Sequence, residues 1–211
     1  MPMFTPDFSP SSEQNQQPIL TRLLQLLPPQ GAALEIASGT GQHAASFASH
    51  LPRWTWQPTD AHTAAFASIS HYAQLAGASN VLAPQRLDVC TEPWWAQPSG
   101  ADAPPTFDLI FCANMLHIAP WAACVGLMQG SARHLAPGGV LVTYGPYLEQ
   151  EVITAPSNLG FDASLRARDP SWGVRWREDV EAAASLAGLR LRTRHTMPAN
   201  NLLLVWARAQ D

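Results

Sequence analysis

The sequence predicts an α/β fold, with a doubly wound, mostly parallel sheet of seven strands that ends in an antiparallel hairpin. Apolar runs of strand length alternate with helical patterns over most of the chain. Such alternation is typical of parallel sheets, because each parallel pair needs a crossover connection. A glycine loop follows the first apolar run, at residues 38–43. The last two extended segments have no helix between them, so we expect them to pair antiparallel.

The size and composition of the chain favour a single domain in aqueous solution. Its 211 residues, 46% of them hydrophobic, are enough for one core and too few for two. A net charge of −4 gives no reason to expect a nucleic acid as partner. No apolar run reaches the roughly 20 residues that a bilayer requires, and no signal-peptide pattern opens the chain. We therefore expect a cytoplasmic protein that binds neither nucleic acid nor membrane.

The inventory of reactive residues excludes several classes of enzyme. All 12 basic residues are arginines. A Walker phosphate loop, a Schiff-base enzyme and a Y-x-x-x-K dehydrogenase each need a lysine, so all three are excluded. The three cysteines show no C-x-x-C spacing and the histidines show no metal-ligand spacing, so we expect neither a disulfide framework nor a metal.

The first helix is expected to begin at Pro18. Residues 1–17 contain three prolines and many polar side chains, so we expect a mobile segment there, followed by one domain over residues 18–211. From Pro18 to residue 27 the apolar positions follow a helical pattern, and two prolines end it. The first strand is then predicted over residues 32–37.

The loop after this strand is suited to a ligand that contains a nucleoside. Gly39 and Gly41 allow a tight turn and leave no Cβ between the main chain and a ligand. The loop also fits the G-x-G-x-x-G/A pattern of dinucleotide-binding folds, and a plain strand-to-helix turn is a further alternative. Glu35 argues against a dinucleotide, because a carboxylate just before the glycines repels phosphate. It favours a cation such as S-adenosylmethionine, which has a sulfonium and an ammonium group and no phosphate.

An acidic residue ends the second predicted strand. Asp60 closes the run over residues 54–60 and lies 21 positions after Gly39. A βαβ unit places a carboxylate near this position, where it accepts hydrogen bonds from both ribose hydroxyls. The alternative is an N-cap for the helix predicted over residues 64–75.

The third predicted strand, over residues 80–89, also ends in an acid. Asp88 can accept a hydrogen bond from the exocyclic amine of an adenine, with Val89 packing on the ring. The alternative role for Asp88 is a loop cap at the end of a strand. A surface loop is expected after it, over residues 97–105.

The fourth strand, predicted over residues 107–114, brings two polar residues to the carboxyl edge of the sheet, where open α/β sheets bind ligands. The amide of Asn114 can hold cofactor or substrate. His117 is equally compatible with a packed or helix-capping imidazole and with a catalytic one. A helix over residues 127–135 and a strand over residues 140–144 follow.

Residues 147–178 break the alternation of strands and helices. The segment is polar and aromatic and comes where the reactive end of a cofactor is expected, so we interpret it as a substrate-covering insertion. A surface helix with internal Arg/Asp pairs is the alternative. A last helix is predicted over residues 178–187, with the terminal hairpin formed by residues 189–195 and 201–207.

These features together resemble the class I S-adenosylmethionine-dependent methyltransferase fold, over residues 18–207. A narrower resemblance, to the UPF0585 family, also called the DUF938 or methyltransferase-like 26 family, is carried by six motifs. They are WQPTD (56–60), LDV (87–89), NMLHIAPW (114–121), TYGPY (143–147), the run P-S-N-x-x-F-D-x-x-L-R-x-R-D-P-x-W-G (156–173) and MPANN (197–201). By position, the resemblance implies that the cofactor site is lined by Glu35, Gly39, Gly41, Asp60, Asp88 and Asn114.

Two segments depart from the family pattern. The family's E-R-N-K-[DE]-P-I-L is E-Q-N-Q-Q-P-I-L here, at residues 13–20, so two cations that could hold the carboxylate of the cofactor are missing. The family's W-G-x-R-D is W-G-V-R-W at residues 172–176, so an acid is absent from the expected substrate face.

The resemblance implies in-line transfer of a methyl group to an acceptor, with catalysis mainly by positioning. If the acceptor must lose a proton, His117, Tyr144 and Asp162 are the candidate bases, in that order. The tryptophans and prolines around residues 147–176 favour a small, partly apolar acceptor. Two alternatives are an oxidoreductase that uses NAD(P) and a non-catalytic binding module.

Overall fold

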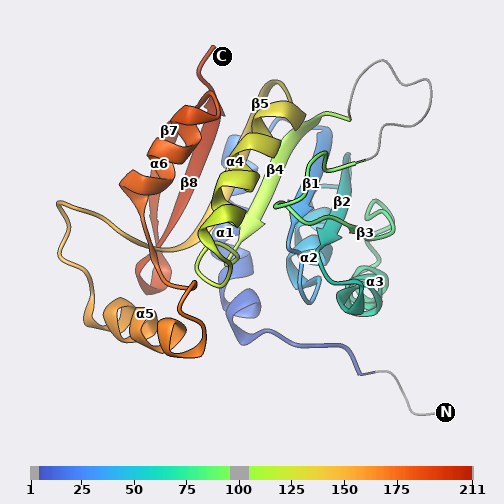
Figure 1. The fold of residues 1–211 in the computed structure, drawn as a ribbon. Helices are drawn as coiled ribbons and strands as arrows, with labels where there is room; N and C mark the ends of the chain where they lie inside the picture. The colour runs from blue at the N-terminus through green and yellow to red at the C-terminus, as the bar shows by residue number, and fades with distance from the viewer. Residues whose placement is uncertain (1–4, 96–104, 211) are drawn as a thin grey trace.

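The computed structural model describes residues 5–95 and 105–210 (Figure 1). Its strands follow the order β3-β2-β1-β4-β5-β8-β7 in one sheet, and a short strand, β6, pairs with the end of β5. The strands are β1 Gly31–Ile36, β2 Trp54–Asp60, β3 Gln85–Arg86, β4 Phe107–Ala113, β5 Leu135–Leu148, β6 Arg175–Trp176, β7 Leu189–Met197 and β8 Asn201–Arg208. Strand β8 runs antiparallel to both of its neighbours, β5 and β7, and the other strand pairs among the described residues are parallel. The predicted fold class is therefore confirmed.

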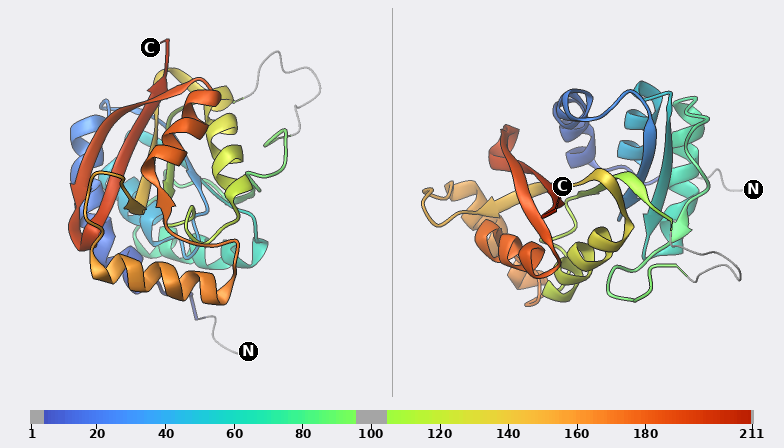
Figure 2. Two further views of the ribbon diagram at one scale, coloured as in Figure 1. Left: turned by 60° about the vertical axis from the view of Figure 1, so that its left-hand side comes forward. Right: turned by 90° about the horizontal axis from the view of Figure 1, so that it is seen from above.

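Helices cover both faces of the sheet, as the two views of Figure 2 show. They are α1 Pro10–Leu26, α2 Gln42–His50, α3 Phe66–Leu75, α4 Trp121–His134, α5 Pro156–Arg168 and α6 Arg177–Leu186. Helices α1 and α2 pack on one face and α4 and α6 on the other. Helix α5 belongs to neither layer and lies beyond the carboxyl ends of the parallel strands (Figure 1).

The core has two halves, because alternate side chains of a strand point to opposite faces. In β4, Leu109 and Phe111 join the cluster under α1 and α2. Ile110 and Cys112 join the cluster under α4 and α6. The same alternation explains why the central strands read as continuous apolar runs. Since both faces are covered, ligands can reach the sheet only at its edges.

The first helix begins earlier than predicted. The side chain of Ser9 accepts a hydrogen bond from the backbone N–H of Ser12 at 3.2 Å, and Pro10 occupies the first turn. This is a favourable start for a helix. Pro18 therefore lies inside α1, and three apolar residues after it, Ile19, Leu20 and Leu23, are fully buried. The prediction of a mobile segment over residues 1–17 is wrong from Pro10 onward.

Other elements also differ in length from the predictions. The strand expected over residues 80–89 is reduced to β3 and one bridge between Trp56 and Val81. Pro84 lies between them and has no N–H to donate to a ladder. Helix α4 begins at Trp121, not at residue 127, and β5 extends the strand predicted over residues 140–144 at both ends. Most of the surface loop predicted over residues 97–105 lies outside the described residues.

No helix in the described ranges is both long enough and apolar enough to cross a bilayer.

Candidate functional site

The glycine loop between β1 and α2 is held in an unusual backbone conformation. Ala37, Gly39 and Gly41 all have positive φ angles, of 54°, 54° and 87°. The backbone N–H of Ser38 donates to the carbonyl of Thr59 at 2.8 Å, and the N–H of Gly41 donates to the carbonyl of Ser38 at 3.0 Å. The loop is thus attached to the end of β2, at the carboxyl edge of the sheet.

The two glycines of the loop have different roles. A Cβ added to Gly39 would meet no atom closer than the carbonyl oxygen of Ala37, at 4.0 Å. A Cβ added to Gly41 would lie 2.4 Å from the Cα of Ile69, in α3. Only Gly39 therefore leaves open space beside the backbone for a ligand. Contrary to the prediction, the missing side chain of Gly41 makes room for a helix.

Asp60 lies directly against the loop. Its Oδ2 accepts a hydrogen bond from the N–H of Gly39 at 3.0 Å, and its Oδ1 accepts one from the N–H of His62 at 2.9 Å. The bond to His62 precedes a 3-10 turn at Thr63–Ala65, but neither this turn nor α3 has a side-chain cap, so Asp60 is not the N-cap that the alternative predicted. Each carboxylate oxygen can accept more than one hydrogen bond. The same side chain can therefore also accept from ribose hydroxyls.

Asp88 and Val89 lie beside Asp60 but face different surroundings. The N–H of Leu87 donates to the carbonyl of Asp60 at 3.0 Å, which places the segment at the same edge. Asp88 is half-buried, and its Oδ1 accepts from the N–H of Cys90 at 2.9 Å. Val89 is only 5% exposed, and its side chain packs in the core under α4. The expected packing of Val89 on an adenine ring is therefore not supported by its position.

Glu35 does not face the crevice above the loop. It is 2% exposed, and its Oε2 accepts a hydrogen bond from the indole N–H of Trp56 at 2.7 Å. Burial, and secondly the charge of Asp60, raises the pKa of Glu35 to about 8. The side chain is therefore mostly neutral at pH 7. The prediction that Glu35 presents a negative charge to a cationic ligand is wrong, because the carboxyl group lies between the sheet and its helices.

Asn114 and His117 meet the end of β5. Asn114 has a φ of 59°, and its N–H donates to the carbonyl of Tyr144 at 2.8 Å. A Cβ added to Gly145 would lie 3.5 Å from the Nδ1 of His117 and 3.7 Å from the Oδ1 of Asn114. The ring of His117 packs edge-on against Phe161 of α5, at 5.4 Å between centroids. The predicted grouping of Asn114 and His117 at the carboxyl edge is confirmed.

The three candidate bases differ in their freedom to act. Burial, with a smaller effect of the Arg175 charge, lowers the pKa of His117 to about 4, so its imidazole is neutral at pH 7. Burial raises the pKa of Tyr144, whose hydroxyl accepts from the Nδ2 of Asn201 at 3.0 Å. The carboxylate of Asp162 is already engaged by its ion pair with Arg166 at 2.8 Å.

The position of Asp162 supports the alternative interpretation of the insertion as a helix with an internal Arg/Asp pair. Its other oxygen accepts from the N–H of Val174 at 2.7 Å and thereby holds α5 against the segment that leads to β6. The N–H of Gly173 in this segment donates to the carbonyl of His117 at 3.0 Å. Helix α5 is thus attached to the segment that follows β4, at the carboxyl edge of the sheet.

Gln42, at the start of α2, is a site residue that the sequence did not reveal. Its Oε1 accepts from the N–H of Ser9 at 2.7 Å and from the hydroxyl of Thr40 at 3.0 Å, and its Nε2 donates to Glu13 at 3.2 Å. The segment before α1 therefore lies over the glycine loop, and Figure 1 shows it running past α2 and α3. A polar residue at the start of a helix is too common to signal such a contact.

The residues that the structure describes contain no group of three or more His, Cys, Asp or Glu side chains that could hold a metal ion.

A family model described as "Protein of unknown function (DUF938)" matches residues 6–208. Among solved structures, the chain is similar to the mitomycin 7-O-methyltransferase, with a TM-score of 0.77 and 15% identity over 94% of this chain and 54% of that one. It is similar to a putative O-methyltransferase from Nostoc punctiforme, with a TM-score of 0.76 and 20% identity over 93% and 57% of the two chains. Human N-acetylserotonin methyltransferase gives a TM-score of 0.71 and 16% identity over 94% and 52%.

These similarities show the fold, which is that of the class I S-adenosylmethionine-dependent methyltransferases. The chain spans little more than half the length of the structures it matches. An alignment of 85 residues shows 39% identity to a mitochondrial enoyl-[acyl-carrier-protein] reductase from Bos taurus, but it covers 36% of this chain and 22% of the reductase. So short a match does not favour an oxidoreductase.

The two loop glycines give a paired prediction about stability. Both have positive φ, so alanine at either position costs about 1–2 kcal/mol of backbone strain. Gly41→Ala also forces Ile69 to move, whereas Gly39→Ala meets open space. We expect Gly41→Ala to lose at least about 1 kcal/mol more free energy of unfolding than Gly39→Ala, measured by urea denaturation. Equal losses would contradict the close packing of Gly41 on α3.

Replacing Glu35 tests its buried, neutral state. Its pKa is about 8 in the folded protein and 4.5 in an ordinary setting, so between these values the folded state keeps a proton that the unfolded chain has lost. Wild-type stability therefore falls as pH rises, by at most about 1.4 kcal/mol per pH unit from this group. Glu35→Gln removes this dependence. The free energy of unfolding of the variant relative to the wild type, measured by urea denaturation, should therefore be higher at pH 8 than at pH 5. A pH-independent difference would refute a protonated Glu35.

Proposed function

The chain belongs to the family described as protein of unknown function (DUF938), and from this premise we propose that it is an S-adenosylmethionine-dependent methyltransferase with a small, partly apolar acceptor. The single observation that carries the proposal is the carboxylate of Asp60 bonded to the N–H of Gly39, beside open space at the turn. In a fold of this class, such a pair can accept from a ribose while the backbone approaches the ligand closely. Two similar structures contain such a ligand: CalO1, a methyltransferase in calicheamicin biosynthesis, holds S-adenosylhomocysteine, and human N-acetylserotonin methyltransferase holds S-adenosylmethionine.

The residues at the edge fit an uncharged nucleoside. Asp60 would accept from the ribose hydroxyls, Asp88 from the adenine amine, and Gly39 would let the backbone approach. Asn114, at the end of β4, is placed for the amino-acid end of the cofactor or for the acceptor. When bound, S-adenosylmethionine would supply an electrophilic methyl group and keep the electron pair of the broken carbon–sulfur bond on its sulfur, and His117 would take the proton of an acceptor hydroxyl.

The protein contributes mainly position and the exclusion of water, which can lower a barrier by about 7–11 kcal/mol in favourable cases. Among the proton acceptors, His117 is the best candidate because its imidazole is neutral and lies beside Asn114 and Gly145. Tyr144 is better suited to donate a hydrogen bond, since burial raises its pKa. Asp162 is occupied by its ion pair and is the weakest candidate.

Two other functions are less well supported. An oxidoreductase that uses NAD(P) is not favoured, because the similar solved structures are methyltransferases or putative methyltransferases and the match to a reductase covers only 36% of this chain. A non-catalytic module is favoured only by the two cations missing at residues 13–20, and Glu13 of that segment still contacts Gln42. Titration with S-adenosylhomocysteine and with NADH distinguishes a methyltransferase from an oxidoreductase. Transfer of labelled methyl groups to a size-fractionated cell extract distinguishes a methyltransferase from a non-catalytic module, and it also shows the size of the acceptor.

We expect Asp60→Asn to weaken S-adenosylhomocysteine binding at least tenfold in calorimetric titration. The substitution removes the charge of a carboxylate that would hold two hydroxyls, and hydrogen bonds to charged groups contribute about 1.5–3 kcal/mol each. Asp108→Asn is a matched control, because Asp108 also accepts a backbone N–H, from Ala32 at 2.8 Å, but at the opposite end of β1. Unchanged affinity in Asp60→Asn, or an equal loss in Asp108→Asn, would remove Asp60 from the cofactor site.

We expect His117→Gln to slow methyl transfer to the labelled acceptor fraction at least tenfold, since general bases contribute about 10²–10⁴-fold to rates. Binding of S-adenosylhomocysteine should be unchanged, and so should the melting temperature to within a few degrees. The exposed residue His50 provides a control as His50→Gln. A transfer rate equal to that of the wild type would show that His117 only packs against Phe161.

A further inference from the structure

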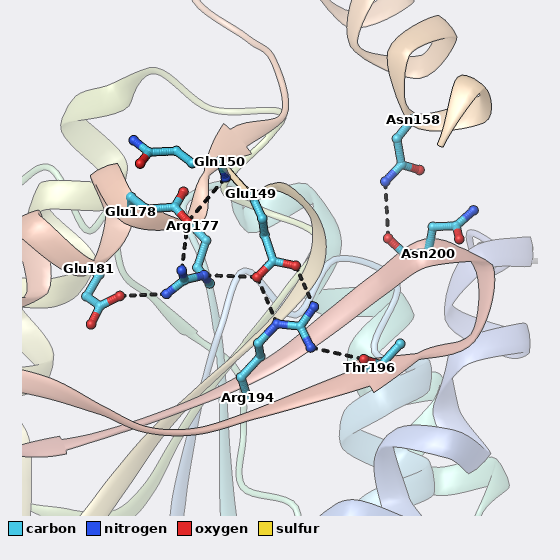
Figure 3. A network of polar contacts seen from close by, with 9 residues as sticks. All are labelled: Glu149, Gln150, Asn158, Arg177, Glu178, Glu181, Arg194, Thr196 and Asn200. Carbon is cyan, nitrogen blue, oxygen red and sulfur yellow. Dashed lines mark hydrogen bonds and ion pairs between the residues drawn. The ribbon is translucent and has the colours of Figure 1, made fainter. Parts of the chain in front are cut away.

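A cavity of about 130 Å³ lies between the connection after β5, helix α5 and the β7–β8 hairpin. Its walls include Val152 and Ile153 from the connection, Asn158 from α5, and Arg194 and Asn201 from the hairpin. Figure 3 shows Asn158 reaching toward the hairpin next to the polar network of Glu149 and Arg194. None of these residues belongs to the cofactor site proposed above.

The cavity lies near the carboxyl end of β5. Because β8 is antiparallel to β5, its first residue, Asn201, pairs with Pro146 near the end of β5. The Nδ2 of Asn201 donates to the hydroxyl of Tyr144, and the carbonyl of Tyr144 accepts from the N–H of Asn114. Two hydrogen bonds thus connect the cavity wall to Asn114, the residue that follows β4.

The orientation of two amides in this wall is determined by their partners. The Nδ2 of Asn158 donates to the carbonyl of Asn200 at 3.1 Å, and the Nδ2 of Asn201 donates to the carbonyl of Pro198 at 3.2 Å. A backbone carbonyl only accepts, so each NH₂ group must face it and each Oδ1 must point the other way. Neither Oδ1 accepts a hydrogen bond from the described residues, and neither is a buried atom without a partner, so both are open to solvent. The wall therefore offers hydrogen-bond acceptors to a ligand.

The charges beside the cavity are already paired. Glu149 accepts from the Nε of Arg194 at 2.8 Å and from the Nε of Arg177 at 3.0 Å. The hydrogen bond from Arg194, together with the charges of both arginines, lowers the pKa of Glu149. Arg177 also pairs with Glu178 and Glu181 (Figure 3). With its charges balanced in this way, the cavity favours a neutral ligand over an anion.

The size and the remaining walls limit the ligand further. An engineered cavity of about 150 Å³ holds one benzene molecule, so a cavity of about 130 Å³ suits a ligand of roughly one six-membered ring. Val152, Ile153 and Leu202 add apolar side chains to the lining; Leu202 is buried, whereas Val152 and Ile153 are largely exposed and can pack on a ligand. Ala199 and Asn200 both have a φ of 57°, a strained conformation for residues other than glycine. The hydrogen bond from Asn158 helps to hold this connection in place.

We propose that this cavity binds the methyl acceptor, and that the acceptor is a neutral molecule with hydroxyl groups on an apolar ring. Its hydroxyls donate to the Oδ1 atoms of Asn158 and Asn201, and its ring packs on the apolar wall. The role of this ligand as methyl acceptor rests on the proposed methyltransferase function, whereas the chemical class of the ligand is inferred from the cavity alone.

Catechol and benzoate are suitable probes, because both have one ring but catechol donates hydrogen bonds and benzoate only accepts them. Dissociation constants are measured by ligand-observed NMR, with and without saturating S-adenosylhomocysteine. We expect catechol to bind at least tenfold more tightly than benzoate. Asn158→Leu and Asn201→Leu should each weaken catechol at least tenfold and leave S-adenosylhomocysteine binding unchanged. Gln74→Leu, an amide-to-leucine change at the α3 surface, is the matched control and should change neither.

Val152→Trp provides a second test of the cavity if an asparagine variant does not fold. Val152 is 52% exposed, so a larger side chain is tolerated and fills the cavity without breaking a hydrogen bond. Catechol should no longer bind to this variant. No binding of catechol to the wild type, tighter binding of benzoate, or undiminished binding of catechol in the variants would overturn the proposal. If catechol binds as expected but S-adenosylhomocysteine does not, the proposed ligand site in the cavity is supported and the proposed methyltransferase function is rejected.

Discussion

The hydrogen bond from the Gly39 amide to the Asp60 carboxylate joins the glycine loop to the end of β2, and the proposed site depends on it. Ala37 in the loop has a positive φ of 54°, which is unfavourable for a residue other than glycine without compensation. The bonds to Asp60 and Thr59 supply that compensation. They also place a carboxylate beside an open stretch of backbone, where a nucleoside can bind.

The two helix layers that cover the faces of the sheet restrict where a ligand can bind. Helices cover both faces of the sheet, so only the carboxyl edge brings together the loop, the acids and the polar residues after β4. Helix α5 and the β7–β8 hairpin extend this edge on the far side of β5 (Figure 1). The edge thereby has two parts: Asp60 and Gly39 belong to the part suited to cofactor, and Asn158 and Asn201 to the part suited to acceptor.

The role predicted for Glu35 is wrong, although the fold that it favoured is correct. An acid before the glycines was interpreted as a charge for a cationic ligand, and that interpretation favoured S-adenosylmethionine. The side chain is instead buried, bonded to Trp56 and mostly neutral. The preference for the methyltransferase fold is confirmed by the comparisons, and the acid that lies against the loop is Asp60.

The sequence by itself determined the order of strands and helices, the parallel sheet with its terminal hairpin, and the meeting of Asn114 and His117 at one edge. These follow from the period of apolar residues and from the rule that parallel strands end at a common edge. Only the tertiary structure decided that Gly41 accommodates Ile69, that Gln42 holds the segment before α1, and that Asn158 meets Asn200 across 42 positions. Such contacts depend on which faces of distant elements meet, and local periodicity carries no information about that.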